Sequence, residues 1–130
     1  MKHYNVVAAV VCHDGKYLCM QKGKTKFEYT SYKWEFPGGK IESGETPQQA
    51  LARELMEEME YPVEVGEELV TLNHEYPDFS ITMTAFLCTP KGDADGFKRR
   101  EHADSKWCSQ EELKGLDWAA ADVGVVASIL

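Results

Sequence analysis

Residues 38–62 read GGKIESGETPQQALARELMEEMEYP, and this stretch decides the fold. Thr46 is a good helix N-cap, and Pro47 suits the first helical position because its missing N–H would have no partner there. A Gln three residues after the cap completes a capping box. Helix-forming residues then continue to Met59, and Pro62 stops them. The stretch therefore predicts a helix that follows a glycine-rich loop.

Three carboxylates share one face of this predicted helix. Glu54, Glu57 and Glu58 stand at i, i+3 and i+4, which places them within an arc of roughly 100°. The adjoining arc is apolar and is expected to face the core, with Leu51, Ala52, Leu55, Met56 and Met59. Like charges at this spacing repel one another, and a divalent cation such as Mg²⁺ would relieve the repulsion. The alternative is a solvent-exposed acidic face, since runs of charge usually face water.

The loop before the helix supplies glycines and a further carboxylate. Gly38 and Gly39 let backbone groups approach a ligand closely. Glu45 is placed to reach back across the loop, and Arg53 is placed to pair with Glu45 and orient the catalytic loop. A loop that exposes backbone to phosphate, next to a helix that holds metal, suits the cleavage of a phosphoanhydride.

Acidic charge is concentrated around this helix. The net charge is −8, and residues 41–68 carry all of it, with nine Glu against Arg53 alone. A protein that binds duplex nucleic acid would instead need a basic face. No apolar run approaches the roughly 18–20 residues that span a bilayer. The start of the chain does not resemble a signal peptide. The four cysteines form no metal-binding or disulfide pattern. We therefore expect a cytoplasmic protein with reduced cysteines, no duplex partner and no membrane partner.

Strand patterns surround the central helix. Extended segments are predicted at 4–11, 17–21, 34–36, 63–72 and 81–88, with a hairpin turn at 13–16 and a stop at 37–39. Residues 91–106 are predicted to be a loop, Trp107 to begin a short strand, and 109–113 and 122–130 to be helices. This order predicts an α/β fold in which a mixed β-sheet is sandwiched between α-helices, as one domain over residues 1–130.

The same residues resemble a known family. The Nudix box is Gly, five residues, Glu, seven residues, Arg-Glu, an aliphatic residue, any residue, Glu-Glu, any residue, Gly and an aliphatic residue. This chain matches it with Gly39, Glu45, Arg53-Glu54-Leu55 and Glu57-Glu58. Glu60 and Tyr61 depart from the last two positions, which leaves the geometry of the helix exit open. The run from Trp34 to Pro47 further resembles the MutT subgroup, as do Tyr76-Pro77-Asp78, Trp107 and Ala121-Asp122.

The resemblance implies a Nudix fold and a metal-dependent pyrophosphohydrolase that acts on a small-molecule nucleotide, as a monomer or a homodimer. The expected metal is Mg²⁺, with Mn²⁺ as a substitute, held by Gly38, Glu54, Glu57 and Glu58. The expected catalytic residues are Arg53, Glu54, Glu57 and Glu101, the last from the loop before Trp107. The expected substrate-binding residues are Lys22, Lys24, Phe36, Gly38, Gly39, Lys40 and Asp122. Solvent exposure is the alternative role for Lys22 and for Lys24, which lies in the predicted loop over 23–33, and core packing is the alternative role for Phe36.

Substrate identity stays open at this stage. The subgroup implies hydrolysis of a (deoxy)nucleoside triphosphate to the monophosphate and pyrophosphate, with 8-oxo-dGTP favoured and CTP, dCTP or 5-substituted dCTP as the alternative. Other nucleoside diphosphate derivatives such as ADP-ribose, and a non-catalytic nucleotide-binding module, are further alternatives. Asp122 lies where similar enzymes read the base. When ionised it would accept from the cytosine amine, and when protonated it would donate to a purine carbonyl. Its other interpretation is a cap on the last helix.

Overall fold

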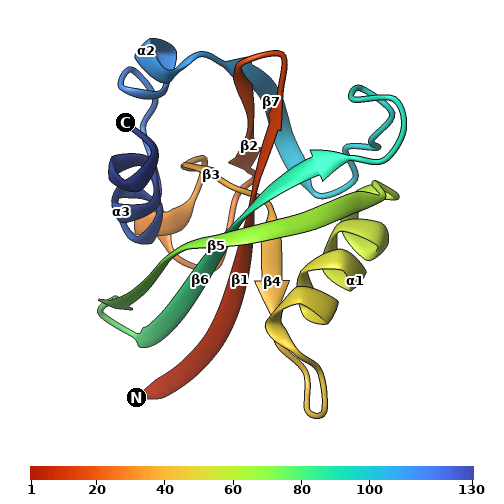
Figure 1. Cartoon of the computed structure of the whole chain (residues 1–130). Coiled ribbons are helices and arrows are strands. Elements are labelled where there is room, and N and C mark those ends of the chain that lie inside the picture. Colours follow the sequence, from red (N-terminus) through yellow and green to blue (C-terminus); the bar gives the residue numbers. More distant parts are fainter.

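A seven-stranded mixed sheet lies between helices in the computed structural model, which describes residues 1–130 (Figure 1). In chain order the elements are β1 (Lys2–His13), β2 (Lys16–Lys22), the 3-10 turn η1 (Glu28–Thr30), β3 (Trp34–Glu35), β4 (Gly38–Lys40), α1 (Pro47–Met59), β5 (Val63–Glu75), β6 (Phe79–Pro90), β7 (His102–Cys108), α2 (Gln110–Leu113) and α3 (Ala120–Ile129). The strand β1 runs parallel to β6 and antiparallel to β4, and β5 and β6 form a hairpin. The strand β2 pairs with β1, β3 and β7. The predicted α/β class with helices on both sides of a mixed sheet is confirmed.

The central strand β1 is buried on both faces, which explains its unbroken apolar run. Val7, Ala9 and Val11 point to one core, together with the apolar face of α1. Ala8 and Val10 point to the other core, together with buried residues of α3. Side chains alternate between the two faces of a strand, so a single strand holds both helices in place. The two helices therefore have a fixed position relative to the sheet, one on each side (Figure 1).

The helix α1 begins as the sequence predicts. The hydroxyl of Thr46 accepts from the Gln49 N–H at 3.1 Å, and the Gln49 side chain accepts from the Thr46 N–H at 3.0 Å. This is a complete capping box, and Pro47 occupies the first helical position. Caps of this kind each contribute about 1 kcal/mol to helix stability. The start of the helix, and with it the position of the carboxylates, is thus encoded locally.

The helix exit is built without the usual glycine. Glu60 takes the left-handed conformation, with φ 48° and ψ 42°. Its N–H donates to the Met56 carbonyl at 3.0 Å, and the Tyr61 N–H donates to the Leu55 carbonyl at 3.2 Å. The first bond, from a left-handed residue back to the carbonyl four positions earlier, is that of the αL motif, and the second satisfies one more of the last helix carbonyls. The exit geometry left open by the sequence is therefore the standard one, carried by a residue with a Cβ.

Three segments differ from the sequence expectations. The strand β4 lies where 37–39 was predicted to stop extended structure, because Gly38 and Gly39 pair with Ala8 and Val7 of β1. The strand β7 begins at His102, within the predicted loop 91–106, so Trp107 lies near its end. Only Cys108 of this strand is buried, which allows its polar sequence, and its strand structure comes from pairing with β2. A 3-10 turn also interrupts the predicted loop over 23–33.

The last helix begins two residues earlier than predicted. It starts at Ala120, and its N-cap, Ala119, makes no side-chain cap bond. Asp122 therefore lies inside the first turn and does not cap the helix. All four cysteines are free, as expected. No helix of the fold combines the length and the apolar character that crossing a membrane requires.

Candidate active site

Arg53 joins the glycine loop to the carboxylate face of α1. Its Nε donates to Glu45 at 2.6 Å and its Nη2 to the other oxygen of Glu45 at 2.9 Å, a bidentate pair. Nη2 also donates to the Lys40 carbonyl at 3.0 Å. Nη1 donates to Glu54 and to Glu57, each at 3.0 Å. All five guanidinium donors are thereby used, which fixes the loop against the helix.

The ion pairs shift the pKa values of both main partners, Glu45 and Arg53. The hydrogen bonds from Arg53, followed by that from the Glu42 N–H, hold the pKa of Glu45 below its usual range. The bond to Glu45 in turn raises the pKa of Arg53 further above its already high value. Each group therefore favours the charged form of the other. The predicted Arg53–Glu45 pair is confirmed, and it is the centre of a wider network.

Glu58 lies in a contrasting environment. Burial, followed by the charges of Glu54, Glu101 and Glu35, raises its pKa well above the usual range for a carboxyl group. Glu101 therefore lies close enough to Glu58 to be felt electrostatically, although the two residues are far apart in sequence. Carboxylates whose mutual repulsion raises a pKa are typical of functional sites. The exposed acidic face considered as the alternative fits Glu57, whose side chain is 59% exposed, but not Glu54 or Glu58.

Gly39 brings the backbone of β4 against these carboxylates. A Cβ at Gly39 would collide with the carboxylate of Glu54, and one at Gly38 would collide with the Val7 carbonyl. Only glycine allows this approach. The backbone of the glycine strand therefore passes directly against the Glu54 carboxylate, and oxygen donors are what Mg²⁺ prefers.

These oxygens fit a divalent cation in kind. Arg53 occupies one oxygen of Glu54 and one of Glu57, which leaves the second oxygen of each available. No three acidic, His or Cys side chains are already gathered around one point. A cation at this face would therefore draw the carboxylates together, with the repulsion around Glu58 as part of the driving force.

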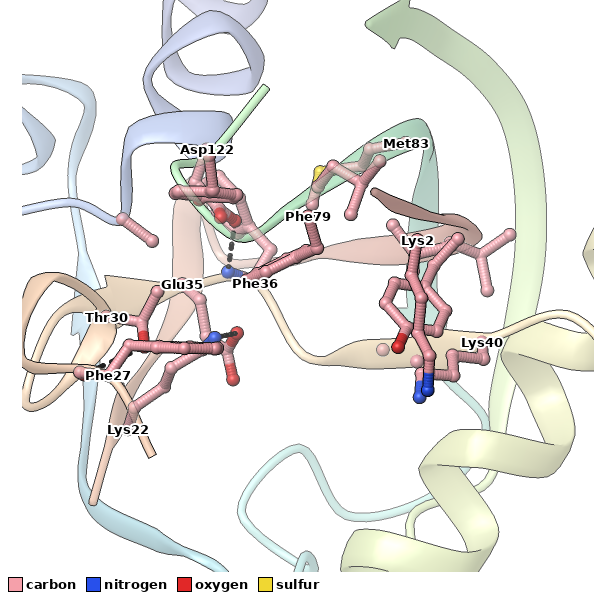
Figure 2. A pocket seen from close by; sticks show the side chains of 18 of the residues that line it. Lys2, Lys22, Phe27, Thr30, Glu35, Phe36, Lys40, Phe79, Met83 and Asp122 are labelled. Atoms are coloured by element: carbon pink, nitrogen blue, oxygen red, sulfur yellow. Dashed lines mark hydrogen bonds and ion pairs between the residues drawn. The ribbon is translucent and has the colours of Figure 1, made fainter. Parts of the chain in front are cut away.

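A cavity of about 810 Å³ opens beside the glycine strand, and Gly38 and Gly39 form part of its wall. Figure 2 shows Lys22 on one side of it and Lys2 and Lys40 on the other, with Phe36 and Asp122 between them. The volume lies in the range of about 300–1,000 Å³ that is usual for small-molecule sites. Because Gly39 also lies against Glu54, the cavity adjoins the carboxylate face.

Aromatic rings form one wall of the cavity. Phe27 stacks on Phe79 with ring centroids 5.7 Å apart, and Phe79 contacts Tyr76 at 4.9 Å and Tyr4 at 6.0 Å. Tyr29 extends the stack behind Phe27 and donates its hydroxyl to Asp78 at 2.8 Å. Flat apolar surfaces of this kind are suited to stacking against a planar base.

Asp122 is the buried acid at the inner end of the cavity. Its Oδ2 accepts from the Phe36 N–H at 3.0 Å, and only 2% of the residue is exposed (Figure 2). Burial, followed by the charge of Glu35, raises the pKa of Asp122 to about 8. The carboxyl is therefore mostly protonated at neutral pH. Its second oxygen then offers a hydrogen-bond donor to the cavity, where an ionised carboxylate would only accept.

The structure sorts the predicted substrate-binding residues. Lys22, Lys40, Phe36, Gly38, Gly39 and Asp122 line the cavity. Lys24 does not line the cavity, and Lys26 lies at its wall instead. Phe36 fills both roles considered for it, because it is buried, stacks on Trp118 at 4.8 Å and also faces the cavity.

Sequence reasoning missed two parts of this site. One is Glu35, whose carboxylate pairs with Lys22 at 3.6 Å and with His102 at 3.0 Å. Its charge contributes to the raised pKa of both Glu58 and Asp122. The aromatic wall of the cavity was also missed. Aromatic residues in the otherwise polar loop after β2, such as Phe27, were the one available signal.

Comparison with known proteins agrees with this geometry. The NUDIX domain family matches residues 1–128. The CTP pyrophosphohydrolase of Escherichia coli K12 is 34% identical over 131 residues, covering 100% of this chain and 93% of its own. The 8-oxo-dGTP diphosphatase of the same organism is 30% identical over 130 residues, covering 99% and 98%.

Solved structures give the same answer. The solution structure of the E. coli ORF135 protein superposes with a TM-score of 0.82 at 33% identity, covering 99% of this chain and 89% of that one. The solution structure of MutT from methicillin-resistant Staphylococcus aureus 252 superposes with a TM-score of 0.73 at 37% identity, covering 99% and 97%. The chain therefore belongs to the Nudix hydrolases.

Proposed function

We propose that this Nudix hydrolase cleaves a (deoxy)nucleoside triphosphate to the monophosphate and pyrophosphate with the help of a divalent cation. One observation carries the proposal. Gly39 lies at once in the wall of a base-sized aromatic cavity and against the carboxylate of Glu54. A nucleotide whose base enters the cavity would therefore place its phosphates beside the acidic face of α1.

The Gly38 carbonyl, Glu54, Glu57 and Glu58 would hold Mg²⁺ or Mn²⁺. When bound, the cation activates a water molecule and neutralises charge on the phosphates. Arg53 positions the oxygens of Glu54 and Glu57 and does not itself need to touch the substrate. Glu54, Glu57 and Glu101 are the candidates for orienting or deprotonating the attacking water. Lys22 and Lys40 at the cavity wall supply positive charge for phosphate oxygens.

For the base we propose an oxidised purine, as in 8-oxo-dGTP. A protonated Asp122 donates through its free oxygen, and the purine carbonyl is an acceptor of matching kind. A cytidine triphosphate is the second candidate, and a specific observation supports it. The E. coli relative that spans the whole chain is named a CTP pyrophosphohydrolase. An ionised Asp122 would accept from the cytosine amine.

A substrate panel tests both parts. We expect kcat/KM for 8-oxo-dGTP to exceed that for dGTP, CTP, dCTP and 5-substituted dCTP in the presence of Mg²⁺. The Asp122→Ala variant should lose most of the preferred activity and little of the rest, because base recognition is removed while the metal-binding face is unchanged. Equal loss for every nucleotide would make Asp122 structural, and base recognition would then have to be sought around Phe36 or Phe79. A preference for a cytidine triphosphate would favour the second candidate.

A further inference from the structure

The loop between β6 and β7, residues 91–101, is tied to the end of α1. The Lys98 N–H donates to the Met59 carbonyl at 2.8 Å. The hydroxyl of Tyr61, a residue that is only 1% exposed, donates to the Ala94 carbonyl at 2.7 Å. The Tyr61 ring also meets Phe97 edge to face, with centroids 5.4 Å apart. The loop thus has a defined course over the helix exit.

Glu60 adds an ionic connection at the end of this loop. Its carboxylate pairs with Lys98 at 3.1 Å and with the guanidinium of Arg100. Arg100 also donates to the Glu57 carbonyl at 3.5 Å. Arg100 immediately precedes Glu101 in the chain.

A second anchor lies on the other side of Glu101. His102 is the next residue, its side chain is 6% exposed, and its Nε2 lies 3.0 Å from the Glu35 carboxylate. Glu101 is therefore held between an anchor to α1 and an anchor to β3. Its own backbone passes Gly23, where an added Cβ would lie 3.7 Å from the Glu101 carbonyl.

We propose that Glu60 is a positioning residue that holds Glu101 beside the metal-binding face of α1 through its ion pair with Arg100. The proposal rests on the function proposed above, in which Glu101 assists the reaction. A carboxylate that orients water or metal must be held within hydrogen-bond reach, and small displacements are costly. Glu60 occupies a left-handed position that glycine would adopt with less strain. Ending the helix therefore does not require its side chain, whereas holding the loop does.

The test is the Glu60→Gly variant, which removes the ion pairs and keeps a residue suited to the helix exit. Because the lost pairs are partly exposed, we expect a moderate fall in kcat of about threefold to tenfold, with KM unchanged. Trypsin cleavage after Lys98, Arg99 and Arg100, followed by mass spectrometry, should accelerate by about the same factor as the loop opens. The thermal midpoint should not fall. Glu111→Gln, which breaks an exposed pair with Lys114 on α2, is the control and should change none of these quantities.

A double mutant separates positioning from a general structural effect. In a Glu101→Gln background, the Glu60→Gly change should cause no further loss of kcat, since the residue that it positions is already disabled. A full additional loss, or wild-type kcat and wild-type trypsin cleavage in Glu60→Gly alone, would overturn the proposal. If the wild-type protein hydrolyses no nucleotide, the proposed function fails, and the role of Glu101 with it. Normal wild-type turnover with an inert Glu60→Gly change overturns the positioning role alone.

Discussion

Replacing Asp122 with Asn should make the protein more stable relative to wild type as the pH rises. The Asn carbonyl can accept from the Phe36 N–H as the Asp122 Oδ2 does at 3.0 Å, and its amide resembles the protonated oxygen. Asn therefore mimics the neutral acid at every pH. Only the wild-type protein has a buried group that must ionise.

The size of the effect follows from the pKa difference between the folded and unfolded chain. Burial and Glu35 raise the pKa of Asp122 from 3.8 to about 8. Between these values the folded state binds more protons than the unfolded state, so the stability of the wild type falls as the pH rises. The slope for one such group is about 1.4 kcal/mol per pH unit. Between about pH 5 and pH 7 the variant should therefore gain about 2 to 3 kcal/mol relative to wild type.

Urea unfolding of both proteins across this pH range measures the difference. Tryptophan fluorescence is a suitable signal because Trp118 stacks on Phe36 next to the buried acid. The pKa of Glu58 is also raised, but that group is present in both proteins and its contribution cancels. The difference in unfolding free energy should rise with pH and level off above about pH 8, where the folded wild type is already ionised.

A difference that stays constant from about pH 5 to about pH 8 would refute the reasoning. It would mean that Asp122 is ionised throughout, that its carboxylate only accepts, and that the preference for an oxidised purine loses its physical basis.

Three further substitutions test the acidic face. Glu58→Gln should lower kcat by orders of magnitude in a metal-dependent assay. The unfolding midpoint should hold, because burial and neighbouring carboxylates oppose the negative charge that the substitution removes. Near-normal turnover in the folded variant would exclude Glu58 from the metal site. Arg53→Lys keeps the charge but cannot reproduce the bidentate pair with Glu45. We therefore expect kcat to fall about a hundredfold and calorimetric Mn²⁺ titration to show weaker binding. Unchanged affinity and rate would refute the positioning role of Arg53. Gly39→Ala should lower kcat because the new Cβ would collide with the Glu54 carboxylate. Gly92→Ala is the control and should behave as wild type, since nothing lies near its added Cβ. Equal rates for the two variants would contradict the close approach of Gly39 to Glu54.

Local signals made the centre of the site predictable. The capping box at Thr46 set the start of α1, and the spacing of Glu54, Glu57 and Glu58 set their common face. Both depend on residues a few positions apart, which interact in the same way wherever the helix is placed. The pairing of Arg53 with Glu45 followed from the same short stretch.

Features made by distant segments could not be predicted in this way. The strand β7 has a polar sequence and becomes a strand only by pairing with β2. The aromatic wall is assembled from the loop after β2 and from the β5–β6 hairpin, through contacts such as Phe27 with Phe79. Asp122 meets the Phe36 N–H across 86 residues of sequence, so its burial, and the raised pKa that follows, is a property of the fold. No local pattern distinguishes Lys26, which lines the cavity, from Lys24, which does not.

The central claim is that the carboxylate face and the cavity act together on the phosphates of a nucleoside triphosphate. The most direct measurement is phosphorus NMR of the products formed from 8-oxo-dGTP and from CTP with Mg²⁺, in wild type and in Glu58→Gln. The account predicts the nucleoside monophosphate and pyrophosphate from the wild type and almost no product from the variant. Orthophosphate with a nucleoside diphosphate, or the same products at the same rate from Glu58→Gln, would contradict it.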